Sequence, residues 1–360
     1  MNTSSSAQGP GIFNAFFESQ YGNCFTYNNI GNNPLTILSN GNLIVTSNQY
    51  DGVHDKIQVT KTNSSGNIIW QNIFTNGYDF KAEYSFEDNS GNIIVLGANQ
   101  YTWMYSKTFI AKLNPVTGDT IWTKSYGYNN QDKALMGYQD SNNNYWLVDI
   151  QGLFGPTTLF KISQNGDSLS SIINSESNSI FYHDALITND KKIILVGESG
   201  SSVFIGKYTD GIKDFSSFIL IDSTYKVNYV KDICETSDGN YVISGSCYIP
   251  NNSSLTYGFL MKVDINGNKI WKRVLNQIPY SEIQSCVERQ SDVFYIGLSE
   301  DPNGYGNLYK YDLSTLTFIY KTYQSSDVQL LIKNSILYRA SLDSKPNYYE
   351  AVTVRAHTIY

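Results

Sequence analysis

The sequence predicts an all-β protein in which seven similar four-stranded sheets close into a ring, a seven-bladed β-propeller. Its short apolar runs end in Asn-Gly, Asp-Gly or related turn sequences, which favour antiparallel hairpins because these residues adopt positive φ. Four such runs make one unit, and the unit recurs about every 50 residues, as propeller blades do. The last copy stops after three runs, which indicates a blade completed from elsewhere in the chain.

The best-defined unit is the stretch of residues 230–275, whose strands we call A, B, C and D in chain order. Turn sequences at 237–240 and 266–268 join A to B and C to D. In strand C, Phe259 and Met261 would point one way and Leu260 the other, so both faces are apolar. A sheet with two apolar faces needs a neighbour on each side, as in a repeat array.

In chain order, residues 1–10 are expected to form a polar tail, and the propeller is expected to be a single domain over 11–360. The expected blades are 21–75, 76–127, 128–174, 175–222, 223–276, 277–324, and 325–360 combined with 11–19. In the seventh copy, strands are expected at 328–332, 336–339 and 349–355. The apolar run at 12–17 would supply the missing outer strand and leave no open sheet edge. No stretch has a sustained 3.6-residue period, so helices are not expected.

Strand D carries a tryptophan in three copies, at Trp70, Trp122 and Trp271. At the predicted equivalent position, the other copies have Leu169, Phe218 and Phe318. We expect this side chain to fill the wedge between neighbouring blades.

Composition excludes several classes of protein. A net charge of −7 and a pI near 5.0 argue against nucleic-acid binding, which needs a basic surface. No apolar stretch reaches the roughly 18–20 residues that span a bilayer. With 41% apolar and 16% charged residues, the chain is unlike disordered proteins.

The cysteines and the first residues bear on the cellular compartment. Cys24, Cys234, Cys247 and Cys286 lack metal-binding spacing and are expected to be buried free thiols, with one disulfide as the alternative. The opening residues lack the apolar segment of a signal peptide. Either the protein is cytoplasmic, or an export signal has been removed.

Two family resemblances follow from the turn motifs. The segment LNPVTGDTIW at 113–122 resembles the tryptophan motif of quinoprotein-type propellers, and VDINGNKIW and TNSSGNIIW are looser versions. The whole chain resembles secreted or surface propellers of Bacteroidetes, whose blades read K-x-D-x-x-G-N-x-x-W. The resemblance implies an exported binding or scaffold protein, extracellular or at the cell surface, and either a monomer or a subunit of a larger surface assembly.

Catalytic and metal-binding signals are weak. Quinoprotein dehydrogenases have eight blades and a Ca²⁺ site, and some have adjacent cysteines, whereas this chain predicts seven blades and has no Cys-Cys pair. A three-histidine metal site would need His54, His183 and His357 together. The turn at 264–267 resembles part of a Ca²⁺ loop, but the twelfth position is Leu275 rather than Glu, so a plain hairpin turn is favoured. No catalytic residue, metal or cofactor is expected. The alternative is a propeller enzyme, either a quinoprotein-like oxidoreductase or a polysaccharide-active hydrolase or lyase.

Binding through loops has better support. The B–C loops are longer and more irregular than the A–B and C–D turns, and they carry aromatic residues beside Asn, Asp and Ser. Such side chains stack on sugars or anchor protein partners. We therefore expect a surface glycan or a protein partner at the face formed by the B–C and D–A loops, although the rings could simply cover the blade ends. The expected ligand-binding residues are Tyr50, Tyr101, Trp103, Tyr105, Tyr248, Tyr257 and Tyr305.

Overall fold

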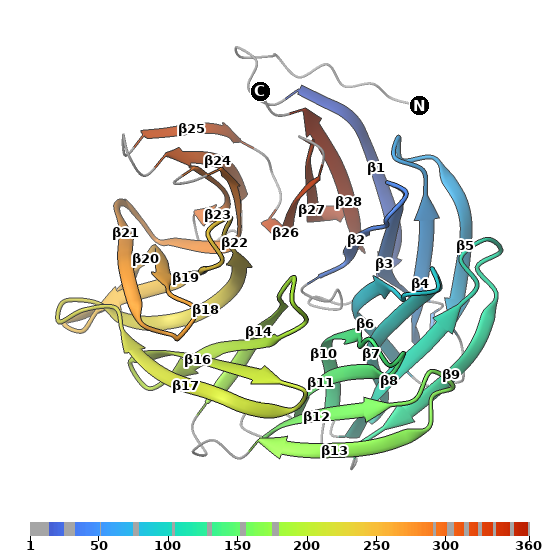
Figure 1. Ribbon diagram of the computed structural model, residues 1–360. Coiled ribbons are helices and arrows are strands. Elements are labelled where there is room, and N and C mark those ends of the chain that lie inside the picture. Colours follow the sequence, from blue (N-terminus) through green and yellow to red (C-terminus); the bar gives the residue numbers. More distant parts are fainter. Residues whose placement is uncertain are drawn as a thin grey trace.

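Seven four-stranded antiparallel sheets stand around a common axis as the blades of a propeller in the computed structural model (Figure 1). The residues that the structure describes are strands, turns and bends, with no helix among them, so none could cross a membrane as a helix. The described residues are 14–24, 33–50, 52–74, 79–102, 105–127, 132–151, 156–174, 180–290, 293–300, 306–312, 317–322, 326–333, 336–345 and 349–358.

Each blade runs outward from strand A at the axis to strand D at the rim (Figure 1). The A strands of blades 1 to 7 are β2 (Leu35–Ile37), β6 (Asp79–Glu87), β10 (Asp132–Gln139), β14 (Phe181–Ile187), β18 (Lys226–Glu235), β22 (Ser281–Gln290) and β26 (Ser326–Lys333). The B strands are β3 (Leu43–Tyr50), β7 (Ile93–Thr102), β11 (Tyr145–Gln151), β15 (Ile193–Ser199), β19 (Tyr241–Ile249), β23 (Val293–Glu300) and β27 (Ile336–Lys345).

The two outer strands of each blade complete the ring. The C strands are β4 (Asp55–Thr62), β8 (Tyr105–Leu113), β12 (Thr157–Ile162), β16 (Ser202–Thr209), β20 (Asn252–Val263), β24 (Gly306–Asp312) and β28 (Tyr349–Thr358). The D strands are β5 (Ile68–Phe74), β9 (Thr120–Tyr126), β13 (Ser168–Asn174), β17 (Ile212–Leu220), β21 (Lys269–Pro279), β25 (Thr317–Thr322) and, in blade 7, β1 (Asn14–Cys24).

The N-terminal strand closes the ring, as predicted. β1 pairs antiparallel with β28, from Asn14 opposite Thr358 to Cys24 opposite Glu350. Figure 1 shows β1 beside β28. At its far end, β1 also makes one parallel bridge to β3, between Asn23 and Gln49. The last blade is therefore built from both ends of the chain.

The hydrophobic core is divided into seven clusters, one at each junction between neighbouring blades. The junction of blades 4 and 5 illustrates the pattern: Ile205 of β16 packs with Phe259 and Met261 of β20, and all three are fully buried. Leu260, on the opposite face of β20, is buried in the next cluster, between blades 5 and 6. Both faces of the middle strands are thus covered by neighbours, as the apolar pattern predicts.

In blades 1, 2 and 5, the C–D hairpin uses an Asp or Asn side chain to hold the turn. In blade 5, the Asp264 Oδ1 atom accepts hydrogen bonds from the backbone N–H groups of Asn266 and Asn268, at 2.9 and 2.8 Å. Gly267 adopts a φ of 81°, and its N–H donates to the carbonyl of Asp264 at 2.9 Å. The Asp264 carboxylate is thus engaged by its own turn, as in a plain hairpin.

The predicted equivalents of the outer-strand tryptophans are wrong in blades 3, 4 and 6. Pairing places Trp70, Trp122 and Trp271 opposite the C-strand lysines Lys61, Lys112 and Lys262. The corresponding lysines of blades 3 and 4, Lys161 and Lys207, face Ser170 and Phe215 instead of Leu169 and Phe218. The same irregularity follows this lysine in blades 1 to 5. In blades 1, 3 and 5 the partner lies nine residues after the lysine, so the error in blade 3 came from expecting a hydrophobic side chain at this position. In blade 4 a shorter C–D turn brings Phe215 to the position. In blade 6, Lys310 faces Ile319, and Phe318 lies opposite Tyr311.

Candidate binding surfaces at the two ends of the ring

The two ends of the ring differ in the connections that they carry. We call the end with the B–C and D–A connections the loop end and the end with the A–B and C–D connections the turn end. Among the described residues, every exposed tyrosine lies at the loop end. They are Tyr101, Tyr105, Tyr229 and Tyr280, with 37%, 48%, 46% and 57% of their surface exposed. These four residues are called the loop-end tyrosines below.

The hairpin of β7 and β8 presents two of them. Asn99 pairs with Lys107 and Thr102 with Tyr105, and an irregularity between Gln100 and Thr102 displaces Tyr101 from the regular register. The Lys107 Nζ atom lies 5.9 Å from the centre of the Tyr101 ring, within the range of a cation–π contact. Tyr101 and Tyr105 thus supply two exposed phenol groups on one hairpin. Trp103, predicted between them, lies outside the described residues.

The other predicted ligand-binding residues have different environments. Tyr257 is 8% exposed and packs edge-on against Tyr225, with ring centres 5.9 Å apart, so its ring is not presented to solvent. Tyr248 is partly buried at the end of β19. Tyr305 and the side chain of Tyr50 lie outside the described residues.

Around the axis at the loop end, charged side chains pair between neighbouring strands. His183 Nε2 lies 2.7 Å from Glu198 Oε1, and Lys231 Nζ lies 3.2 Å from Glu282 Oε1. Tyr229 stands between these pairs: its ring centre is 5.1 Å from Lys231 Nζ and 6.2 Å from the ring centre of His183. A mixed surface of tyrosine and paired charges therefore lies beside the axis in blades 4 to 6.

Sequence reasoning did not select Tyr229. It lies in strand A, whereas the prediction considered mainly loops. Register irregularities follow Tyr182 in β14 and both Val227 and Val230 in β18, and they change the alternation of side chains along these strands. Of the three histidines considered for a metal site, His183 pairs with Glu198 at 2.7 Å, His54 lies 3.2 Å from Asp79, and the side chain of His357 lies outside the described residues. In the described part of the chain, no group of three or more His, Cys, Asp or Glu side chains could hold a metal ion.

Midway along the axis, two carboxyl groups join neighbouring blades. Asp184 Oδ2 accepts the N–H of Ile233 at 3.3 Å, and Asp232 Oδ2 accepts the N–H of Cys286 at 2.6 Å. Burial raises the pKa of Asp184 well above its ordinary value, and the adjacent Asp232 raises it further. Burial also raises the pKa of Asp232. Because both carboxyls are bound to the next strand, we interpret them as structural links between blades 4, 5 and 6.

The described cysteines agree with the free-thiol expectation. Cys234, Cys247 and Cys286 are free, and the side chain of Cys24 is not described. The Sγ atoms of Cys234 and Cys286 lie 3.6 Å apart across the junction of blades 5 and 6.

At the turn end, a repeated contact ties the A–B turns of blades 1, 2, 4 and 5 to the next blade. The first turn residue donates its N–H to a carboxylate or amide oxygen at the end of the next A strand. The pairs are Ser39 to Glu87 at 2.6 Å, Asn89 to Gln139 at 2.7 Å, Asn189 to Glu235 at 3.2 Å and Ser237 to Glu288 at 2.6 Å. We call this contact the turn clamp. Between blades 3 and 4 the acceptor position is Ile187, which has no oxygen to offer.

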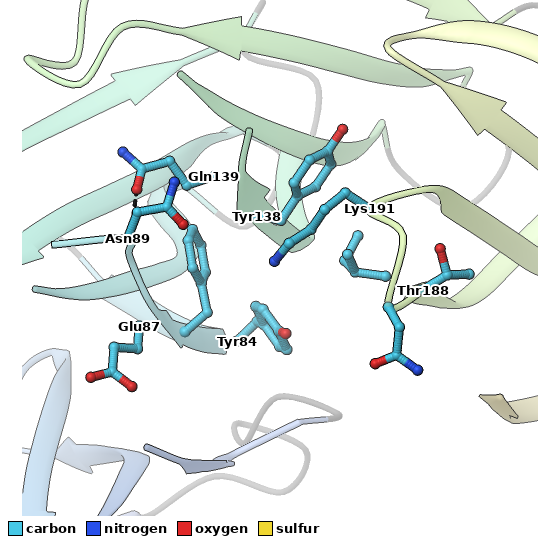
Figure 2. Close-up of a pocket in the computed structure, with 11 residues that line it drawn as sticks. Tyr84, Glu87, Asn89, Tyr138, Gln139, Thr188 and Lys191 are labelled. Carbon is cyan, nitrogen blue, oxygen red and sulfur yellow. Dashed lines mark hydrogen bonds between the residues drawn. The ribbon is translucent and has the colours of Figure 1, made fainter. Parts of the chain in front are cut away.

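A hollow of about 250 Å³ opens at the turn end where this clamp is missing, between blades 2, 3 and 4 (Figure 2). Its lining includes Tyr84, Phe86, Asn89, Tyr138, Ile187 and Lys191. Burial raises the pKa of Tyr84 to about 12, so its phenol is neutral at physiological pH. The hollow therefore combines aromatic walls with amide groups and one lysine.

Comparison with known proteins identifies the architecture. No protein-family model matches the chain, and no curated relative matches it. Several solved structures match the chain. YCF48 bound to D1 peptide has a TM-score of 0.58 and 9% identity over 98% of this chain and 97% of that one. The β-propeller domain of Myceliophteria thermophila Cps50 (Swd1) has a TM-score of 0.56 and 8% identity over 97% of this chain and 100% of the domain.

An enzyme shares the fold over part of its length. Puromycin hydrolase has a TM-score of 0.56 and 8% identity, and the match covers 93% of this chain and 55% of the hydrolase. These likenesses show the fold. The chain is a seven-bladed β-propeller.

Proposed function

We propose that the chain is a non-catalytic binding propeller that engages a protein partner through its loop end. The observation that carries the proposal is the distribution of tyrosine: all four exposed tyrosines of the described chain lie at this one end. Tyrosine supplies a large contact area together with a hydroxyl group that can donate or accept a hydrogen bond, and it is enriched at binding hot spots.

The charges around the axis favour a protein partner over a neutral sugar. Tyr229 lies among Lys231, His183 and their carboxylate partners Glu282 and Glu198, so charges of both signs are available beside an aromatic ring. Such a surface suits a polypeptide segment that carries both apolar and charged side chains. One protein with the same fold, YCF48, is known in complex with a peptide, the D1 peptide.

Two alternatives have less support. A surface glycan would use Tyr101 and Tyr105 as stacking platforms, and it remains the second candidate because both rings are exposed. An enzymatic role would need reactive groups, but the two axial carboxyls, Asp184 and Asp232, are bound by backbone N–H groups of the next strands. The extracellular or cell-surface location is a proposal that rests on the motif resemblance.

Selection from a phage-displayed library of random peptides provides the test. Peptides selected on the full chain should lose affinity for the double variant Tyr101→Ala/Tyr105→Ala and for Tyr229→Ala by roughly tenfold or more each, as anchor residues do. The control is Tyr241→Phe, a buried tyrosine of blade 5. Peptides that bind all variants equally would contradict the proposal. Glycan-array binding that depends on Tyr101 and Tyr105, with no selected peptide, would favour the second candidate.

A further inference from the structure

We propose that the hollow at the turn end is a second binding site, which takes a carboxylate group carried next to an aromatic side chain of a peptide. It lies at the end of the ring opposite the loop-end tyrosines and does not depend on the function proposed for them. Three features distinguish this hollow: a contact that four other blade junctions have is missing, a lysine lies at its edge, and aromatic residues line it.

The hollow exists because one turn clamp is absent. At four other junctions, a Glu or Gln side chain reaches across and accepts a hydrogen bond from the preceding A–B turn. At the junction of blades 3 and 4, Ile187 occupies this position and lines the hollow. Ser141, the first residue of the A–B turn of blade 3, therefore faces a side chain without an oxygen that could accept its N–H. Three neighbouring A strands consequently leave an open space between their ends.

Lys191 is the second departure from the repeat. The third turn residue is in the left-handed region in each described A–B turn of blades 1 to 5, and in three of them it is glycine: Gly41, Gly91 and Gly239. In blade 4 it is Lys191, with φ of 64°, a conformation that side-chain-bearing residues rarely adopt. Its side chain extends over the hollow and its ammonium group points toward the centre (Figure 2).

The other charged and amide groups nearby are already engaged. The Glu87 carboxylate accepts two hydrogen bonds from Ser39, at 2.6 and 3.0 Å, and points away from the centre of the hollow (Figure 2). The Gln139 oxygen accepts the N–H of Asn89, and the Asn189 side chain donates to Glu235 at 3.0 Å. Lys191 thus supplies the positive charge that the lining directs into the hollow, and an anionic group is its complement.

The side chains that line the hollow indicate which chemical group would bind beside the anionic group. Tyr84 and Tyr138 lie on either side of the Lys191 ammonium group in Figure 2, and Phe86 also lines the hollow. A volume of about 250 Å³ is at or below the lower end of pockets that enclose drug-sized ligands, so it suits one residue of a partner rather than a long segment. A carboxylate adjacent to an aromatic side chain satisfies both features. It can come from the end of a chain, as in a C-terminal Phe, or from an acidic residue next to Phe.

Titration followed by NMR tests the site with matched pairs of small probes. N-acetyl-phenylalanine should bind the full chain more tightly than its neutral amide, by about fivefold for one exposed ion pair. Acetyl-Phe-Asp-amide against acetyl-Phe-Asn-amide provides the same comparison for an acidic side chain. Preference for the charged member in the first pair, the second or both identifies the source of the carboxylate. Equal binding within both pairs overturns the proposal.

Two variants separate binding from folding. Lys191→Gly introduces the glycine found in the turns of blades 1, 2 and 5, so it should melt at the same or a higher temperature while the charge preference disappears. Ile187→Glu should reintroduce the turn clamp toward Ser141 and exclude the probes. Lys192→Gln, at the next position, is the matched control and should keep the preference. If Lys191→Gly binds both probe pairs with the wild-type preference, the assignment to this hollow is wrong.

Discussion

At the scale of single residues, the blade motif is explained by contacts between neighbouring blades. Trp70 of blade 1 lies against the C–D turn of blade 2, where its Nε1 donates to the Pro115 carbonyl at 3.2 Å. A Cβ atom at Gly118 would come within 2.7 Å of the Trp70 ring. The glycine of the motif is therefore required twice, for its φ of 79° and for the space that the ring of the preceding blade occupies.

Removing that ring should destabilise the junction of blades 1 and 2. Trp70 is 8% exposed, and we expect Trp70→Ala to lower the free energy of unfolding by roughly 3–5 kcal/mol, because it leaves a cavity against the next blade. Ile69→Ala, at an exposed neighbouring position, should change it by less than about 0.5 kcal/mol. Urea denaturation measures both. Similar losses for the two variants would show that Trp70 does not fill the wedge.

A buried carboxyl in blade 3 should make stability depend on pH. Asp149 is fully buried, Thr108 donates a hydrogen bond to its Oδ1 atom, and burial raises the pKa of Asp149 to about 8. Folding therefore favours the protonated acid. Asp149 therefore contributes to the free energy of unfolding. Its contribution is complete when the pH is below about 4, the pKa of Asp149 in the unfolded chain, and it is lost as the pH rises toward 8.

The substitution Asp149→Asn removes the titrating carboxyl group and keeps an oxygen that can accept the hydrogen bond from Thr108. We expect the free energy of unfolding of the wild type to fall between pH 5 and pH 8 relative to that of the variant, by up to about 1.4 kcal/mol for each pH unit. Any decline that the variant retains reflects the other buried carboxyls, Asp184 and Asp232. Denaturation curves at pH 5, 6.5 and 8 provide the comparison. Parallel curves for the two proteins would contradict a neutral Asp149.

At the scale of elements, the sequence contains enough information for the strands and the ring closure. Alternating apolar residues and Gly-containing turns locate the hairpins, and the incomplete last copy predicts β1 as the outer strand of blade 7. The residue opposite the C-strand lysine was misplaced in blades 3 and 4, because a hydrophobic residue near the usual spacing was expected there. In blade 3 the partner is the polar residue Ser170, and in blade 4 a shorter C–D turn brings Phe215 to this position.

The candidate surfaces were predictable only in part. Loop composition selected Tyr101 and Tyr105, which are exposed, but it also selected Tyr257, whose burial depends on contact with the adjacent blade. Tyr229 and the hollow depend on how A strands from different blades face one another. Comparing the repeats could have revealed Ile187 and Lys191 as departures, although their spatial relation emerges only in the folded ring.

Deleting residues 1–24 tests the closing strand. Without β1, the edge of β28 from Tyr349 to Thr358 loses its hydrogen-bonding partner and becomes available to other chains. We expect a lower melting temperature and concentration-dependent aggregation, measured by calorimetry and light scattering. Deletion of residues 1–11 alone is the control and should leave both unchanged. A truncated chain that melts like the full one and stays monomeric would contradict the closure.

At the scale of the whole molecule, the ring separates two surfaces with different chemistry. Seven inter-blade clusters and the links through Asp184, Asp232 and the turn clamps hold the blades in fixed relation. The loop end can then vary its side chains without changing the core, which is how a rigid scaffold presents binding residues on loops. In this chain, the loop-end tyrosines are the side chains that the rigid ring presents in this way.

Hydrogen–deuterium exchange of the full chain, with and without a saturating peptide selected on it, tests binding at the loop end most directly. We predict slower exchange in the β7–β8 hairpin around Tyr101 and Tyr105 and in the first residues of β18 and β22, near Tyr229 and Tyr280. The A–B turns and the outer D strands should exchange at the same rate in both samples. Protection confined to the turn end or to the D strands, with the β7–β8 hairpin unchanged, would contradict the account.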